Sequence, residues 1–458
     1  MRPVPIAGLK SRILHAGFWT LGAYGAEAII RLATSLILAK LLFPEAFGVM
    51  AIVNTIPAAL IMLSDIGIRS SIIRRGQALD TDFLRTAWTV QTIRGLVLWL
   101  IVVIMCLLLG LPAVREWLPP DSALADPLLP WLLATTTFVL VLAGLQSANI
   151  YVHERDIHVR QVLINSVISK IVPLPFIVII AYSYHSVWAM VVGALISALT
   201  SSAASHLLLA GRPMRFAWHV EHARTLLADG KWIAFSSANN LLISQGDRLA
   251  LSVLMTAGQL GLYSIAWMLL DALRSFLQRL ISQLTLPILS ELYRTKPGSA
   301  VASYYRFRRP IDAAAFATAG VLMGCGPAIV GVLYGGRYAD SGIILQILAL
   351  SLVTLPFGMT LELFLANNQV RTYGNLATVA STCFVGAIFL GNIIAGWHGV
   401  VWGIALYRWP QLLLAGLLAY RRGWILPLRE ITMLPLAGLG AAIGFAVNLA
   451  LKAMGVWP

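Results

Sequence analysis

Long apolar stretches follow one another along almost the whole chain, and short polar segments separate them. A helix needs ~20 consecutive apolar residues to cross the hydrocarbon core of a membrane. One segment, 431–451, begins close to Pro427 and Pro435 and is expected to form an extra C-terminal span. The chain is therefore predicted to be an all-α polytopic membrane protein. Twelve other spans are predicted at 13–41, 46–68, 86–111, 128–152, 162–181, 187–209, 232–255, 260–289, 310–333, 343–366, 376–395 and 400–420.

A polar stretch rich in Arg and His divides these spans into two series of six. The predicted parts are an N-terminal six-helix lobe at 1–210, a cytoplasmic inter-lobe linker at 211–231, a C-terminal six-helix lobe at 232–420 and the extra span within 421–458. No loop between predicted spans exceeds roughly two dozen residues, whereas a folded domain has ~50 or more. A separate catalytic domain is therefore not expected.

The first and seventh predicted spans each carry a narrow polar stripe. Side chains that recur at the helical period share one face of a helix. In the first span the stripe consists of Thr20, Tyr24, Glu27, Arg31, Thr34 and Ser35. In the seventh it consists of Ser236, Ser237, Asn240, Ser244, Asp247 and Arg248. Each residue of the first stripe from Tyr24 onward has a counterpart in the second stripe, and the distance along the chain between the two is the same for every pair. Because six spans separate them, the lobes are predicted to be parallel repeats around a central cavity.

Several cations fall inside predicted spans, where each costs on the order of 2.5–3.5 kcal/mol and must face protein or water. The eighth span has a polar stripe of Asp271, Arg274, Ser275, Gln278 and Ser282, with Arg279 just beyond its edge. The deepest cations are Arg31, Lys170, Arg248 and Arg274, which are expected to line the cavity. Arg94 and Arg408 lie nearer the predicted helix ends, where a long side chain can reach the interface.

The cationic excess favours an anionic ligand such as a diphosphate that bears a glycan. Guanidinium groups form bidentate hydrogen bonds with phosphate oxygens. Lys170 has no acidic neighbour in its own helix, which favours a binding role. Polar side chains on the same faces, among them Tyr24, Asn240 and Gln278, can hydrogen-bond sugar hydroxyls.

A structural interpretation of the same charges stays open. Glu27 and Arg31 are four residues apart, and Asp271 and Arg274 are three apart, so each pair can neutralise itself on one helix face. The acidic residues would either couple transport to protons or sodium or pair with nearby Arg. They are Glu27, Asp65, Asp247, Asp271 and Glu362.

Composition and charge agree with a membrane protein. The chain has 458 residues, of which 59% are hydrophobic and 11% charged, and its net charge is +14. Most of the 33 Lys and Arg lie in predicted loops on one side, and such loops face the cytoplasm. This asymmetry predicts a cytoplasmic N-terminus and argues against nucleic-acid binding. The opposite side carries only Lys40, Arg115, Arg337 and Lys452.

Metal and disulfide chemistry is not indicated by the sequence. The three cysteines, Cys106, Cys325 and Cys383, are isolated in apolar runs, and the eight His residues form no HExxH motif. We therefore expect neither a metal site nor a cofactor.

Three segments carry a resemblance to a known family. They are GFWTLGAYGAEAIIRLATSLILAKLLFPEAFGVMAIVNTI with DIGIRSSIIRR, then SSANNLLISQGDRLALSVLMTAGQLGLYSIAWMLLDALRSFLQRLISQLTLPILSEL, then LYGGRYADSGIILQILALS. They resemble bacterial polysaccharide exporters of the oligosaccharide-flippase type, whose superfamily includes multidrug and toxin extruders and lipid II flippases. A thirteenth span departs from the twelve or fourteen usual in that superfamily.

The resemblance implies translocation of a polyprenyl-diphosphate-linked O-antigen or exopolysaccharide unit across the bacterial inner membrane by alternating access. It implies a cationic central cavity that would include Arg31, Arg248 and Arg274, and it implies partners among the polymerase and glycosyltransferases of the pathway. Two alternatives are a cation-coupled multidrug antiporter, which an anionic cavity would suit better, and an integral polysaccharide polymerase or glycosyltransferase. The enzyme would need a long periplasmic loop, and none is predicted.

Overall fold

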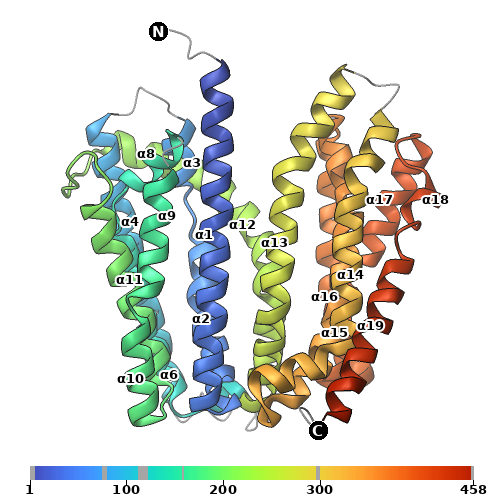
Figure 1. Ribbon diagram of the computed structural model, residues 1–458. Helices are drawn as coiled ribbons and strands as arrows, with labels where there is room; N and C mark the ends of the chain where they lie inside the picture. Colours follow the sequence, from blue (N-terminus) through green and yellow to red (C-terminus); the bar gives the residue numbers. More distant parts are fainter. Residues whose placement is uncertain (1–5, 75–79, 112–121, 157–158, 296–299, 455–458) are drawn as a thin grey trace. The chain divides into compact units, whose positions relative to one another are not determined.

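Every regular element in the part of the chain that the computed structural model describes, residues 6–74, 80–111, 122–156, 159–295 and 300–454, is a helix (Figure 1). Within these ranges ten helices are long and apolar enough to cross a membrane, or up to eleven if one bent pair counts as a single span. The prediction of an all-α polytopic membrane protein is confirmed.

The chain forms two compact units, Met1–Leu249 and Ala250–Pro458. The helices of the first are α1 (Ile6–Leu41), α2 (Pro44–Leu63), α3 (Ile68–Arg74), α4 (Thr81–Leu109), η2 (Ala123–Ala125), α6 (Leu129–Thr136), α7 (Val139–Gly144), α8 (Asn149–Arg155), α9 (Val159–Ile171), α10 (Leu174–Tyr184), α11 (Trp188–Leu207) and most of α12 (Val220–Leu254). Those of the second are α13 (Ala257–Thr295), α14 (Ala300–Tyr334), η4 (Gly336–Tyr338), α15 (Ala339–Ala366), α16 (Val370–Leu406), α17 (Trp409–Arg421), α18 (Pro427–Glu430) and α19 (Pro435–Ala453).

The polar stretch 211–231 is irregular only as far as His219, because α12 begins at Val220 and continues without a break. The C-terminal half of α12 carries the polar stripe predicted for the seventh span. The four-part division of the chain into lobes, linker and extra span stays a prediction.

The predicted span 128–152 is a broken helix in which α8 is bent by 62° relative to α6 and α7. The side-chain amide of Gln91, on α4, donates hydrogen bonds to the carbonyl oxygens of Ala143 and Gly144 at 3.1 Å each. An unpaired carbonyl in hydrocarbon costs several kcal/mol. The neighbouring helix α4 thus supplies hydrogen-bond donors for carbonyl oxygens that have lost their helical partners at the break.

The two spans predicted at 376–395 and 400–420 form a tight helical hairpin. The long helix α16 is interrupted at Gly396, which has φ 58° and ψ −142°, a conformation that favours glycine. A Cβ on Gly391 would collide with the carbonyl oxygen of Gly399, so the backbones on the two sides of the break touch. The chain therefore reverses here, as the sequence predicts.

Most of the predicted segment 431–451, from Pro435 onward, lies in α19, which packs closely against α14 (Figure 1). Both helices carry glycines four residues apart: Gly320 and Gly324 on α14, and Gly440 and Gly444 on α19. A Cβ on Gly440 would lie 2.8 Å from the carbonyl oxygen of Ala317, and one on Gly444 would lie 2.6 Å from that of Val321. Small residues let membrane helices approach closely enough for backbone contact. The C-terminal helix is thus an integral part of the second unit.

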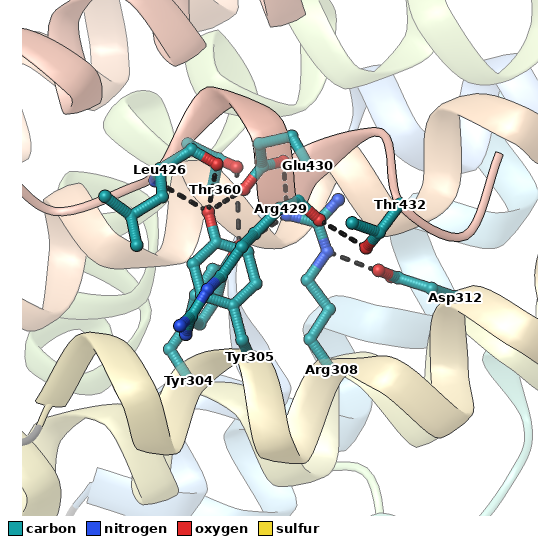
Figure 2. A network of polar contacts seen from close by, with 9 residues as sticks. All are labelled: Tyr304, Tyr305, Arg308, Asp312, Thr360, Leu426, Arg429, Glu430 and Thr432. Carbon is teal, nitrogen blue, oxygen red and sulfur yellow. Dashed lines mark hydrogen bonds and ion pairs between the residues drawn. The ribbon is translucent and has the colours of Figure 1, made fainter.

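A buried ion network fixes the chain that leads into α19 (Figure 2). The Arg308 side chain is fully buried on α14, and its Nε donates to Asp312 Oδ1 at 2.9 Å. Its Nη1 donates to Glu430 Oε2, and the Tyr305 hydroxyl donates to the other oxygen of Glu430 at 2.7 Å. The guanidinium therefore has a carboxylate on each side. One partner comes from its own helix and one from α18.

Replacing a single glycine should separate α14 from α19. We expect Gly440→Leu to lower the unfolding midpoint in detergent, because overpacking a close helix contact costs about 1–3 kcal/mol. The matched control is Gly438→Leu on the same helix, since a Cβ there meets nothing within 4 Å. The packing argument would be wrong if both variants unfolded at the same temperature.

Breaking the ion network should destabilise the second unit strongly. We expect Arg308→Met to lower stability by about 3–5 kcal/mol, because it leaves buried carboxylates without their cation. The control is Arg309→Met, which removes the same charge from an exposed position one residue away. Thermal unfolding followed by circular dichroism measures both, and equal midpoints for the two variants would contradict this account.

Candidate substrate site in the membrane

In the first unit the polar stripe of α1 meets α9. The hydroxyl of Ser166, on α9, donates a hydrogen bond to Glu27 Oε1 on α1. Arg31 lies one turn from Glu27, and Lys170 lies one turn from Ser166, so all four share the facing sides of the two helices. The cationic side chains of Arg31 and Lys170 are both exposed. Lys170 thus has a carboxylate-bearing face opposite it, although its own helix has none.

Tyr24 and Asp65 lie outside this group of four. The Asp65 carboxylate accepts a hydrogen bond from the backbone N–H of Gly67 at 2.8 Å and stabilises the turn after α2. Tyr24 lies within electrostatic reach of Arg69, whose Nε is 2.6 Å from Glu154 Oε2. That hydrogen bond raises the pKa of the Arg69 guanidinium, so the guanidinium stays charged at physiological pH.

The stripe predicted for the seventh span lies near the end of α12. The Ser244 hydroxyl contacts Met62 Sδ of α2 at 3.6 Å, and Asp247 is only 2% exposed. Arg248 is partly buried and donates to Gln245 Oε1 at 3.4 Å. The side chain of Asn240 lies outside the described residues.

In the second unit the charged stripe of α13 is partly exposed. The guanidinium of Arg274 lies 5.7 Å from the ring centre of Trp267, two turns earlier on the helix. Among the described residues no ion pair joins Arg274 to Asp271, although their spacing would allow one. Gln278 is exposed, and Arg279 is partly buried. Arg274 is thus covered on one face by an aromatic ring and is not neutralised by its own helix.

Arg408 was expected nearer a helix end, and it lies between the end of α16 at Leu406 and the start of α17 at Trp409. Its Nη2 points at α15, at 3.9 Å from where a Cβ on Gly358 would lie. Pro410 occupies the first turn of α17, a position where proline is tolerated.

Glu362 lies one turn beyond Gly358 on α15 and is partly buried. Tyr373, on α16, is within electrostatic reach of both Glu362 and Arg408. Arg408 also interacts electrostatically with Arg274. The structure therefore brings Arg274 and Glu362 into one neighbourhood of the second unit, together with two residues, Tyr373 and Arg408, that the sequence had not assigned to the site.

The described residues contain no group of three or more His, Cys, Asp or Glu side chains that could hold a metal ion. Cys106, Cys325 and Cys383 are free thiols. The chemistry that these neighbourhoods can perform is binding, through guanidinium, ammonium, hydroxyl and carboxylate groups.

A family profile described as "Polysaccharide biosynthesis protein" matches residues 37–343, well over half of the chain. No curated protein sequence gives a significant match.

The fold is similar to that of solved transporters. A structure of the lipid II flippase MurJ in an inward closed conformation has a TM-score of 0.71 at 12% identity, over 95% of this chain and 93% of that chain. An inward-facing multidrug resistance transporter of the MATE family has a TM-score of 0.60 at 18% identity, over 86% of this chain and 93% of that chain. A MOP superfamily transporter from Pyrococcus furiosus has a TM-score of 0.60 at 18% identity, over 90% of this chain and 95% of that chain. Its binding pocket is described as having reverse polarity.

These matches confirm the fold and the family predicted from the three resembling segments, and the solved structures of similar fold are those of transporters. The chain belongs to the polysaccharide biosynthesis protein family and has the fold of the MOP superfamily of transporters.

Proposed function

We propose that the protein translocates polyprenyl-diphosphate-linked oligosaccharide units across the bacterial inner membrane by alternating access, for O-antigen or exopolysaccharide synthesis. Its N-terminus would lie in the cytoplasm, as the distribution of Lys and Arg predicts. The family is one of polysaccharide biosynthesis, and one protein of similar fold is named as a flippase of lipid II. Both facts support a lipid-linked sugar as the substrate.

The observation that carries the proposal is the exposure of cations on membrane helices of both units. In the first unit Arg31 and Lys170 are exposed, and in the second Arg274 is partly exposed and forms no ion pair with Asp271. Guanidinium and ammonium groups replace part of the hydration of a diphosphate. Arg31, Lys170 and Arg248 of the first unit and Arg274 of the second are each proposed to contact the anionic substrate during transport.

The remaining polar residues would contact the glycan or balance the charge. Tyr24, Asn240, Gln278 and Arg279 supply hydrogen-bond donors suited to sugar hydroxyls. Glu27, Asp247, Asp271 and Glu362 supply carboxylates that would pair with the cations or take up a coupling proton or sodium ion, whereas Asp65 is engaged by the turn after α2. The polymerase and glycosyltransferases of the same pathway are the proposed partner proteins.

Removing one cation should stop transport without affecting insertion. We expect Arg31→Ala and Arg248→Ala each to abolish surface glycan display, because each removes a charge-assisted contact with the diphosphate. The control is Lys40→Ala, an exposed cation at the end of α1. Display is measured on cells with an antibody or lectin, and the membrane fraction is blotted for expression.

The test becomes decisive with a deletion strain. Mass spectrometry should find a polyprenyl-diphosphate-linked saccharide accumulating there, confined to the cytoplasmic leaflet. Normal display in the deletion strain and in both variants would refute the proposal, and increased drug sensitivity with normal display would favour the multidrug antiporter instead.

A further inference from the structure

The chain between α17 and α19, residues 422–434, forms a connecting segment at one end of the second unit (Figure 1). Its surface carries two kinds of side chain. The guanidinium groups of Arg422 and Arg429 are exposed. Leu428 is 80% exposed and Ile431 is 54% exposed. The segment therefore presents cations, which favour water, next to large apolar side chains, which favour hydrocarbon.

The backbone of the connecting segment is held firmly. Gly423 has φ 71°, and the Trp424 N–H donates to the Ala419 carbonyl oxygen at 3.0 Å, a pattern that closes the C-terminal end of a helix. Further along, the Leu426 N–H donates to the hydroxyl of Tyr305, on α14, at 2.9 Å (Figure 2). The side chains of the segment are therefore displayed from a fixed backbone.

Aromatic rings position both exposed arginines. The Arg422 Cζ lies 5.2 Å from the ring centre of Phe364, on α15, and 5.2 Å from that of Trp424. The Arg429 Cζ lies 5.8 Å from the ring centre of Tyr305. A ring covers the face of a guanidinium and leaves the N–H groups in its plane available. Since neither arginine forms an ion pair with a described residue, both are positioned without being neutralised.

The surroundings of the segment add positive charge. Glu430 is its one acidic residue, and this carboxylate is buried against Arg308. Arg421 is exposed at the end of α17, and Arg306 and Arg309 are exposed on the turns of α14 that contact the segment. The surface at this end therefore calls for an anionic partner.

The apolar side chains restrict the kind of anion. A dissolved anion would neutralise the arginines and leave Leu428 and Ile431 in contact with water. An anionic phospholipid meets both requirements, because one molecule carries the phosphate and the acyl chains. The segment begins where a candidate membrane span, Val370–Arg421, ends, which is the level of lipid headgroups. A zwitterionic headgroup is disfavoured because its own cation is repelled by the surrounding arginines.

We propose that the connecting segment docks on anionic phospholipid of the surrounding membrane, such as phosphatidylglycerol. Arg422 and Arg429 donate to headgroup phosphates, and Leu428 and Ile431 contact the acyl chains. The partner is a lipid of the bilayer and not the transported molecule, so this surface is independent of the transport function. The segment also lies outside residues 37–343, which the family profile matches.

The test uses fluorescence of the purified full chain in phosphatidylcholine vesicles that contain increasing fractions of brominated phosphatidylglycerol or brominated phosphatidylcholine. Bromine on acyl chains quenches nearby tryptophan, and Trp424 reports on the segment. Its emission is obtained by subtracting that of the same protein with Trp424→Phe. In the wild type, brominated phosphatidylglycerol should quench Trp424 at the lower fraction of lipid.

Removing either arginine should reduce this preference. We expect Arg422→Gln and Arg429→Gln each to lower the affinity for phosphatidylglycerol relative to phosphatidylcholine about fivefold, because a cation near an anionic membrane surface contributes ~1 kcal/mol. The matched control is Arg337→Gln, an exposed arginine beyond the other end of α14, and it should behave as the wild type does.

Further variants separate charge, apolar contact and misfolding. Arg422→Lys keeps the charge and should retain most of the preference, whereas Leu428→Ser should weaken quenching by both lipids alike. Each variant must elute from gel filtration as the wild type does. Equal quenching by the two lipids in the wild type, or an equal loss of preference in Arg337→Gln, would refute the docking surface. Relief of the quenching by inorganic pyrophosphate would assign the arginines to a diphosphate ligand and overturn the assignment to phospholipid.

Discussion

Every backbone polar group inside the hydrocarbon must find its partner within the protein, because lipid offers none, and a buried charge is costly unless it is paired. This constraint explains why Gln91 of α4 reaches the carbonyl oxygens at the broken end of α7. It also explains the network in which Arg308 lies between Asp312 and Glu430. Helix breaks and buried charges therefore occur where a neighbouring element supplies the missing partner, and they fix which helices pack together.

The helices themselves could be predicted from the sequence, because a span needs a long apolar run and little else. Even the hairpin on either side of Gly396 follows from two runs with a short polar interval between them. The bend of the predicted span 128–152 could not be predicted, since the side chain that stabilises it lies on another helix. Likewise α14 begins well before the predicted start at Pro310, because proline within a helix removes one hydrogen bond and does not end the helix when packing holds both sides.

The candidate site was less accessible to sequence reasoning because spacing along one helix shows which pairs are allowed and not which ones form. The spacing of Glu27 and Arg31 on one helix could not show that Glu27 also accepts a hydrogen bond from Ser166 of α9. Asp271 and Arg274 have such a spacing too, and Arg274 lies over Trp267 instead. The surroundings of Arg408 could not be predicted, because the face of α15 that its side chain approaches is distant in sequence.

Arg308 and Arg408 are the same residue type in the same unit, and their surroundings separate two uses of a membrane arginine. Arg308 is fully buried between two carboxylates and the hydroxyl of Tyr304, so its charge is balanced within the chain and it holds α18 to α14. Arg408 is partly exposed, lies near a second guanidinium and forms no ion pair with a described residue. The charge of Arg408 therefore holds no carboxylate of a neighbouring helix in the described part of the chain, and its side chain is positioned by its close approach to Gly358 of α15.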